Sequence, residues 1–339
     1  MKLFSYTVFG AAAATLMSAG AAISDTTLTL NSWLPPSHPY MTGVIEPLVA
    51  DIETATEGRI TVNILPAPLG PPPATFDLVK NGVVDIGYSV QGYSPGRFKT
   101  SALAEMPFLG EDAISTSVAY QRVHDAMLAD AGEYQGVKVL AVHTHGPGRI
   151  YSTEQIASLD DLSGQKLRTG SVVAHDLAQS LGAVPVEGPS SKSYELLSQK
   201  VVDGIMFPAE SVQFFRLGDL LSTAFVAEGG IYNTAFMVVM NENKWNQIPE
   251  ADQALIEPLL GEALARRAGE MWNEADAAGN EALSATLTTY QASAEEIAAL
   301  KERVQPVVEA NVALASEAGV DGQAAYDMLL AEIEKLSAQ

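Results

Sequence analysis

Residues 164–208 read GQKLRTGSVVAHDLAQSLGAVPVEGPSSKSYELLSQKVVDGIMFP, and this stretch decides the fold. The segment from Lys166 to Arg168 has the pattern of a short strand, and the chain turns at Thr169 and Gly170 into a helical segment. Arg168 therefore stands at the carboxyl end of a strand, which is where open α/β sheets bind ligands. A guanidinium at this place can hold a carboxylate through two parallel hydrogen bonds. The stretch predicts an α/β protein that binds an organic anion.

Strands and helices alternate on the N-terminal side of this stretch. We predict strands at 27–33, 59–65, 83–90 and 137–143, and helices at 41–55 and 113–131. This alternation is typical of a largely parallel sheet flanked by helices. We interpret Gly146-Pro147-Gly148 as the crossing into a second set of α/β units that spans 149–231.

The C-terminal part of the chain is predicted to return and then to become helical. Residues 231–240 form an apolar strand, which we expect to rejoin the first sheet. Beyond Pro249 the apolar residues follow helical spacing, and we expect a helix that continues to about residue 290. Ser293 and Glu296 form a candidate capping box for the next helix.

Composition restricts the classes of function. The 339 residues carry 41 Asp and Glu against 19 Lys and Arg, a formal net charge of -22. This charge argues against nucleic acid and against anionic lipid as partners. The absence of cysteine excludes disulfides, thiolate metal sites and cysteine nucleophiles. An acidic protein that binds an anion needs a local positive site, so its few arginines carry special weight.

The N-terminus has the pattern of a secretory signal peptide. Lys2 supplies a thin positive region, and residues 4–17 are apolar but too short to span a bilayer comfortably. Small residues at 18–22 provide a cleavage site, for example after Ala21 or Ala22. We expect an exported mature chain that does not insert into a membrane.

Two short motifs suggest chemistry but fit it poorly. Residues 92–96 match G-x-S-x-G, the nucleophile elbow of α/β-hydrolases, with Ser94 as the candidate nucleophile. Pro95 follows the serine and has no backbone N–H to donate to an oxyanion, which makes a plain turn the better interpretation. His143 and His145 could share one face of a strand, but zinc requires a third ligand that no spaced motif supplies. A histidine that makes a polar contact lining a cleft, or a simple buried or surface histidine, is the better interpretation. We therefore expect no metal and no cofactor.

Several segments of the chain resemble the solute-binding subunit of tripartite ATP-independent periplasmic (TRAP) transporters, the DctP-like family. The matching segments occur in order along nearly the whole mature chain. They are residues 82–86, 95–98, 106–108, 159–168, 181–186, 194–197, 202–204, 239–245 and 248–249.

The resemblance implies a two-domain periplasmic-binding-protein-like α/β fold. Each domain would be a mixed, mainly parallel sheet flanked by helices, with one long helix spanning both domains. We expect residues 1–22 to be the signal peptide, 23–145 plus 232–270 to form domain I, and 146–231 plus 271–339 to form domain II, with the ligand cleft between them. The resemblance also implies no enzymatic activity. It implies a periplasmic protein that captures an organic acid through an arginine clamp and delivers it to integral membrane permease subunits, driven by an ion gradient.

The resemblance also assigns roles to individual residues. Arg168 would fix the ligand carboxylate, and Arg149 stands where a second pocket arginine often precedes the segment. Sialic-acid and C4-dicarboxylate members commonly carry an asparagine where this chain has Phe207, so an aromatic wall replaces a polar donor. This predicts a monocarboxylate with an apolar or aromatic body. The other candidate ligand-binding residues are Trp33, His38, Tyr88, Gln91, Tyr93 and Asn233.

Alternatives remain open at this point. The ligand could instead be a dicarboxylate or a sugar acid bound by the same family. The chain could be a secreted α/β hydrolase that uses Ser94, or a periplasmic sensor subunit that presents a ligand to a receptor. Arg168 could pair with a buried Asp, and the aromatic candidates could be core residues.

Overall fold

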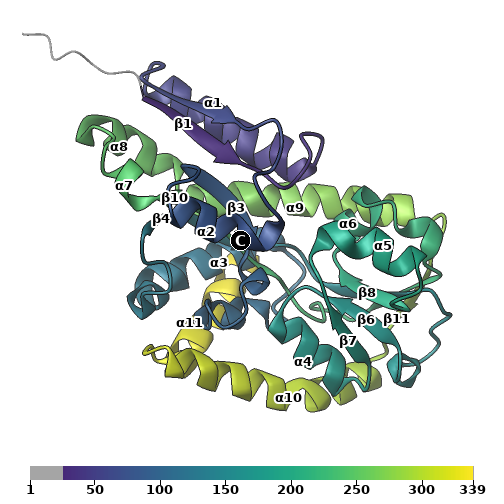
Figure 1. Ribbon diagram of the computed structural model, residues 1–339. Coiled ribbons are helices and arrows are strands. Elements are labelled where there is room, and N and C mark those ends of the chain that lie inside the picture. The colour runs from purple at the N-terminus through teal and green to yellow at the C-terminus, as the bar shows by residue number, and fades with distance from the viewer. Residues whose placement is uncertain (1–25, 339) are drawn as a thin grey trace, which may run out of the picture.

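The computed structural model describes residues 26–338, and the expected signal peptide of residues 1–22 lies outside them. Two β-sheets form the centres of two domains that lie side by side (Figure 1). The first sheet has the strand order β2 (Ile60–Ile64), β1 (Thr26–Asn31), β3 (Ile86–Val90), β10 (Ala235–Asn241) and β4 (Val137–Thr144). The second sheet has the order β11 (Thr288–Gln291), β9 (Thr223–Val226), β5 (Arg149–Ser152), β8 (Gly204–Phe207), β6 (Lys166–Thr169) and β7 (Val184–Glu187).

Both sheets are mixed, and parallel pairings are a small majority over the two sheets together. Five of the nine strand pairings are parallel: β1 with β2 and β3, β6 with β7 and β8, and β9 with β11. Strand β10 is buried along its whole length and runs antiparallel between β3 and β4. The expectation that the apolar segment near 231–240 rejoins the first sheet is thereby confirmed.

Helices cover both faces of the sheets and connect the two domains. The helices are α1 (Glu46–Ala55), α2 (Thr75–Lys80), α3 (Ala113–Val123), α4 (Val172–Ser180), α5 (Ser193–Ser198), α6 (Ala209–Phe214), α7 (Glu242–Trp245), α8 (Glu250–Ile256), α9 (Glu262–Leu283), α10 (Ala294–Glu317) and α11 (Gly322–Ser337). Helix α9 packs against α3 of the first domain and α6 of the second, so it spans both domains as expected (Figure 1). Among residues 26–338, no helix combines the length and the apolar character needed to cross a bilayer.

Two features of the C-terminal part differ from the sequence-based expectation. The helix expected to run from beyond Pro249 to about residue 290 is interrupted: α8 ends at Ile256, and α9 begins at Glu262 and ends at Leu283. Pro258 lacks a backbone N–H, and Gly261 adopts φ +56°, so the helical ladder breaks between them. The capping box at Ser293 and Glu296 does form at the start of α10.

Helix α11 packs with the first domain, although we expected residues 271–339 to lie with the second. Its buried residues Ala325, Leu329 and Ile333 belong to the core beside α3. The amphipathic pattern of α11 shows which face is buried but not which domain buries it. Helix α10 also contacts both domains, and Figure 1 shows it running along one side of the molecule.

Besides helices α9 and α10, which contact both domains, the chain crosses between the domains at two adjacent segments, 145–148 and 227–234. Gly148 N donates to Tyr232 O at 2.9 Å, and Ile231 N donates to Gly148 O at 2.9 Å, so the crossings pair with each other. A Cβ on Gly148 would come within 2.2 Å of the Tyr232 ring, so only glycine permits this approach. The Gly146-Pro147-Gly148 segment therefore connects β4 of the first domain to β5 of the second.

Candidate ligand-binding site

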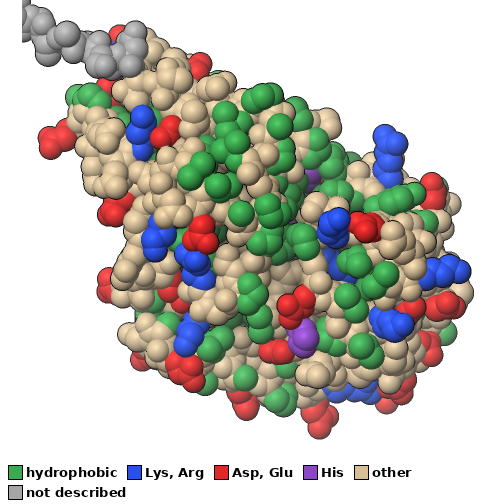
Figure 2. All heavy atoms as spheres, in the orientation of Figure 1, with side chains coloured by type: hydrophobic (Ala, Val, Ile, Leu, Met, Phe, Trp, Pro, Cys, Tyr) green, Lys and Arg blue, Asp and Glu red, His purple; other side chains and the backbone are tan. Residues whose placement is uncertain are grey.

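A cavity lies between the two domains, and small-molecule sites occur preferentially at such domain interfaces. Hydrophobic side chains gather along the junction between the domains on the face shown in Figure 2, and acidic side chains are spread over the rest of that face. The cavity is lined by Trp33, Leu34, His38, Tyr88, Val90, Tyr93, His145, Arg168, Gly170, Ser190, Phe207, Pro208, Ser211, Phe215, Tyr232, Thr234, Phe236 and Trp272.

Arg168 is the charged centre of this cavity. The β6 strand places it in register with Ile205 of β8, and its side chain is only 2% exposed. Its Nε and Nη2 donate to the Gly188 carbonyl at 2.9 and 2.6 Å, and its Nη2 lies 3.5 Å from the Tyr93 hydroxyl. The guanidinium stacks on Phe207 with its carbon 4.6 Å from the ring centroid, a cation–π geometry.

The Arg168 guanidinium has no carboxylate partner among the residues that the structure describes. Among residues 26–338, no Asp or Glu oxygen lies within ion-pair distance of it, and no acceptor is bonded to its Nη1. None of the described residues that line the cavity is Asp or Glu. A buried charge without a partner is strongly unfavourable, so the arrangement favours an anion that enters from solution.

Stacked aromatic rings form the wall of the cavity on the side of the first domain. Trp33 stacks on Tyr88 with ring centroids 5.6 Å apart, and Tyr88 stacks on Phe236 at 5.7 Å. Phe236 in turn stacks on Trp272 of α9 at 5.6 Å. Rings in such mutual contact are rigid and present flat apolar surfaces. The cavity therefore presents flat apolar surfaces beside a single positive charge.

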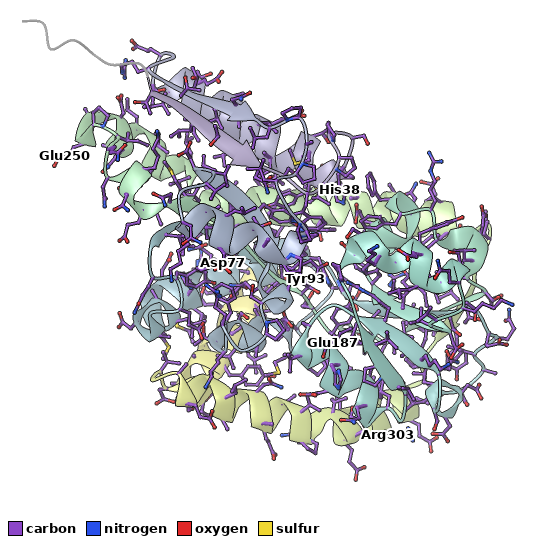
Figure 3. The ribbon with its side chains drawn as sticks, in the orientation of Figure 1. His38, Asp77, Tyr93, Glu187, Glu250 and Arg303 are labelled. Carbon is purple, nitrogen blue, oxygen red and sulfur yellow. The ribbon has the colours of Figure 1, made fainter. Side chains whose placement is uncertain are left out.

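Contacts across the cleft hold the two domains together around the cavity. The backbone N–H of Ser190 in the second domain donates to the Tyr93 hydroxyl of the first at 2.8 Å. Nε2 of His38, in the loop after β1, lies 3.3 Å from Oε1 of Glu210 on α6. Figure 3 shows both His38 and Tyr93 at the junction of the domains. The structure is therefore a closed form in which a ligand would be shielded from water.

The His38–Glu210 pair is neutral near pH 7. Burial lowers the pKa of His38 to about 3. Burial also raises the pKa of Glu210 to about 8, opposed by a hydrogen bond from Ser211 and reinforced by the charge of Asp276. Nδ1 of His38 accepts from the Tyr40 backbone N–H at 3.1 Å, so the neutral ring carries its proton on Nε2, the nitrogen that lies 3.3 Å from Oε1 of Glu210. The pair closes the cleft without adding a negative charge to it.

The sequence profile of the family described as "Bacterial extracellular solute-binding protein, family 7", or DctP, matches residues 30–313. The chain belongs to this family. Its members are solute-binding proteins of transport systems and not enzymes, which removes the hydrolase alternative that used Ser94.

This family 7 member is similar to two proteins of solved structure and to one named transporter protein. A TRAP periplasmic solute-binding protein from Bordetella bronchiseptica, solved with (R)- and (S)-mandelate, is 36% identical, with 92% of this chain and 99% of the other covered and a TM-score of 0.89. A marine metagenome TRAP protein described as specific for aromatic acids, solved with 3-hydroxybenzoate, is 31% identical over 92% and 99% of the two chains, with a TM-score of 0.86. A protein named outer membrane transporter protein TsaT, from Comamonas testosteroni, is 29% identical over 91% of this chain and 92% of its own.

Six of the nine candidate residues come together in the cavity of this family 7 protein. They are Trp33, His38, Tyr88, Tyr93, Arg168 and Phe207. The departure at Phe207, which was the basis for expecting an apolar ligand, places an aromatic ring directly under the Arg168 guanidinium.

The remaining three candidates lie elsewhere. Arg149 lines a separate hollow beside α9, where its Nη1 donates to the Asn280 side chain. Gln91 turns away from the cavity and bonds the Tyr120 and Tyr134 hydroxyls. Asn233 supports the wall from behind, where its amide nitrogen can donate to the carbonyls of Gly146 and His145 at 2.8 and 3.0 Å.

Sequence reasoning missed several lining residues. Tyr232 and Thr234 flank Asn233 on the second crossing segment, and period-two alternation there could have indicated that the neighbours of Asn233 face the cavity. Trp272 lies in the middle of α9, and nothing local to its helix distinguishes it from a core residue. His145 was considered within the paired-histidine motif as a polar contact lining a cleft, but it was not placed among the candidate ligand-binding residues.

The paired histidines do not form a metal site. Nε2 of His143 lies 2.9 Å from the Tyr40 hydroxyl, whereas His145 faces the cavity. Within residues 26–338, no group of three or more His, Cys, Asp or Glu side chains is arranged to hold a metal ion.

Proposed function

We propose that this protein captures an aromatic monocarboxylate between its two domains and delivers it to the membrane permease of a TRAP transporter. The observation that carries the proposal is the buried Arg168 guanidinium, which has no carboxylate partner within residues 26–338. The carboxylate of the ligand would take that place and accept two hydrogen bonds from the guanidinium. Exclusion of water by the closed cleft would strengthen this ion pair.

The aromatic walls support an aromatic body for the ligand. A flat ring would pack between the stacked side chains of Trp33, Tyr88 and Phe236 and the Phe207 ring on the opposite domain. The ligands named for the Bordetella bronchiseptica and marine metagenome proteins, mandelate and 3-hydroxybenzoate, have this form. A dicarboxylate or a sugar acid would place additional polar groups against apolar rings, which is unfavourable.

The proposed role in transport is inferred from the family to which the chain belongs. TRAP solute-binding proteins work with membrane permeases, and we propose the same for this chain, after export and cleavage of residues 1–22. N-terminal sequencing of the protein purified from a periplasmic fraction tests the export step. Ligand uptake by vesicles that contain the permease subunits, with and without the purified protein, tests the delivery step.

Thermal-shift screening tests the ligand class. The panel contains mandelate, 3-hydroxybenzoate, benzoate and phenylacetate on one side and succinate, sialic acid and glucuronate on the other. A ligand at about 100 times its Kd adds about 2.7 kcal/mol of stability. We expect the aromatic monocarboxylates to raise the melting temperature most, and a clear preference for succinate or a sugar acid would refute the proposal.

A further inference from the structure

A second polar position faces the cavity at His145. This residue directly follows β4, is 2% exposed, and lines the cavity together with Trp272. Aromatic rings fix its position: the ring centroids of Tyr232 and Trp272 lie 5.4 and 5.9 Å from that of His145. Its imidazole is therefore a fixed part of the cavity wall.

The hydrogen bonding of His145 defines which ring nitrogen carries the proton. Nδ1 contacts the carbonyl oxygen of Gly146, which can only accept, so Nδ1 is the donor. The Asn233 amide holds the carbonyls of this segment in place. Burial lowers the pKa of His145 to about 4, so the ring is neutral at pH 7. Nε2 is consequently a lone-pair acceptor.

Two buried nitrogens in this wall have no partner among residues 26–338. Nε2 of His145 can only accept, and Nε1 of Trp272 can only donate. Buried polar atoms are nearly always paired, and those left unpaired are costly. A carboxylate or a hydrocarbon has no hydrogen to offer to Nε2. A hydroxyl group can donate to Nε2 and also accept from a neighbouring N–H.

We propose that the ligand is an aromatic hydroxy acid whose hydroxyl donates to Nε2 of His145. The inference rests on the proposed function, because the carboxylate of the same molecule occupies Arg168. Nε1 of Trp272 is the donor available to the hydroxyl oxygen. His145 is thus a specificity-determining residue that distinguishes a hydroxylated acid from the same acid without the hydroxyl.

The test compares two matched pairs of acids by isothermal titration calorimetry. The pairs are mandelate with phenylacetate and 3-hydroxybenzoate with benzoate. In the wild-type protein, the hydroxylated acid of at least one pair is expected to bind roughly 5- to 100-fold more tightly than its partner. His145→Phe keeps the aromatic packing and removes the acceptor, so the ratio should fall to within about twofold.

Two further variants identify the hydrogen bond as the cause. His145→Gln keeps an acceptor near the position of Nε2 and should retain part of the preference. His143→Phe is the matched control, since His143 is equally buried but bonds Tyr40, and it should leave the ratio unchanged. Equal loss in the Gln and Phe variants at position 145 would attribute the preference to ring shape and overturn the inference.

The outcomes distinguish a failure of the proposed function from a failure of the proposed hydroxyl subsite at His145. If none of the four acids binds to the wild-type protein, the proposed function fails. If all four bind but hydroxylation has no effect, or if the preference survives in His145→Phe, only the hydroxyl subsite is overturned.

Discussion

Replacement of Arg168 by methionine tests the central feature of the site. Methionine retains an unbranched stem that can pack on the Phe207 ring, but it removes every N–H of the guanidinium. In the wild-type complex the ligand carboxylate and the guanidinium form a buried pair. Removal of one partner of such a pair costs about 3–5 kcal/mol, which corresponds to a loss of affinity of roughly a hundred- to several-thousand-fold.

The same substitution should have a small effect on the ligand-free protein. The wild-type guanidinium is buried without a carboxylate partner, so its removal eliminates an unfavourable charge while it also deprives the Gly188 carbonyl of two donors. These effects oppose each other. We expect the melting temperature without ligand to stay within a few degrees of the wild-type value, as for sites whose charge serves binding at the expense of stability.

The assay uses the two tryptophans that line the cavity, Trp33 and Trp272, as fluorescent reporters of mandelate or 3-hydroxybenzoate binding. Arg149→Met is the matched control, because Arg149 lines a different hollow and bonds Asn280. It should change the affinity by less than about tenfold. The reasoning is refuted if Arg168→Met binds as tightly as wild type, or if Arg149→Met causes the larger loss.

Three further substitutions test closure, electrostatics and ligand shape. Gly92→Val should prevent closure of the cleft, because even a Cβ at this position would lie 2.4 Å from the Ser171 Cβ of the other domain. The affinity for ligand should fall at least about tenfold, and small-angle scattering should show no compaction of the variant when ligand is added. Burial raises the pKa of Glu210 from 4.5 to about 8, so the folded state binds more protons than the unfolded state between these values, and stability falls as the pH rises from 6.5 to 8. Glu210→Gln should reduce this fall by an amount on the order of 2 kcal/mol, and melting curves with equal slopes in both proteins would contradict the assignment. Phe207→Asn removes the ring under Arg168 and should weaken aromatic monocarboxylates about tenfold relative to succinate in calorimetric titrations; an unchanged ratio would show that Phe207 does not select the ligand.

Local sequence patterns predicted the parts of the site that depend on strand ends and on glycine-containing turns. Arg168 could be placed because a short strand, a glycine turn and a helix follow one another within 164–180, and this order fixes where the side chain stands. The return of β10 could be placed because a fully apolar strand must be buried between neighbours. In both cases the decisive information lies within a few residues of the position predicted.

The remaining parts of the site depend on contacts between distant segments. Gln91 directly follows the end of β3, a position close to that of Arg168 near the end of β6, yet its side chain turns toward Tyr120 and Tyr134, which lie 29 and 43 positions away in sequence. Arg149 pairs in register with Phe207, but its side chain reaches α9. Trp272 enters the cavity only because α9 crosses both domains. No local sequence pattern indicates these contacts between distant segments, so they are seen only in the folded structure.

The acidic composition of the chain and an anionic ligand are compatible because of where the carboxyl groups lie. The formal net charge is -22, yet the described residues that line the cavity include no Asp or Glu. Glu210, which lies next to cavity-lining Ser211 and contacts His38, has a pKa raised to about 8 by burial and is mostly protonated at pH 7. Arg168 therefore meets the ligand without a competing carboxylate nearby. The acidic surface contributes to solubility, and the sign of the charge inside the cleft depends on one strand-end arginine and on the burial of one glutamate.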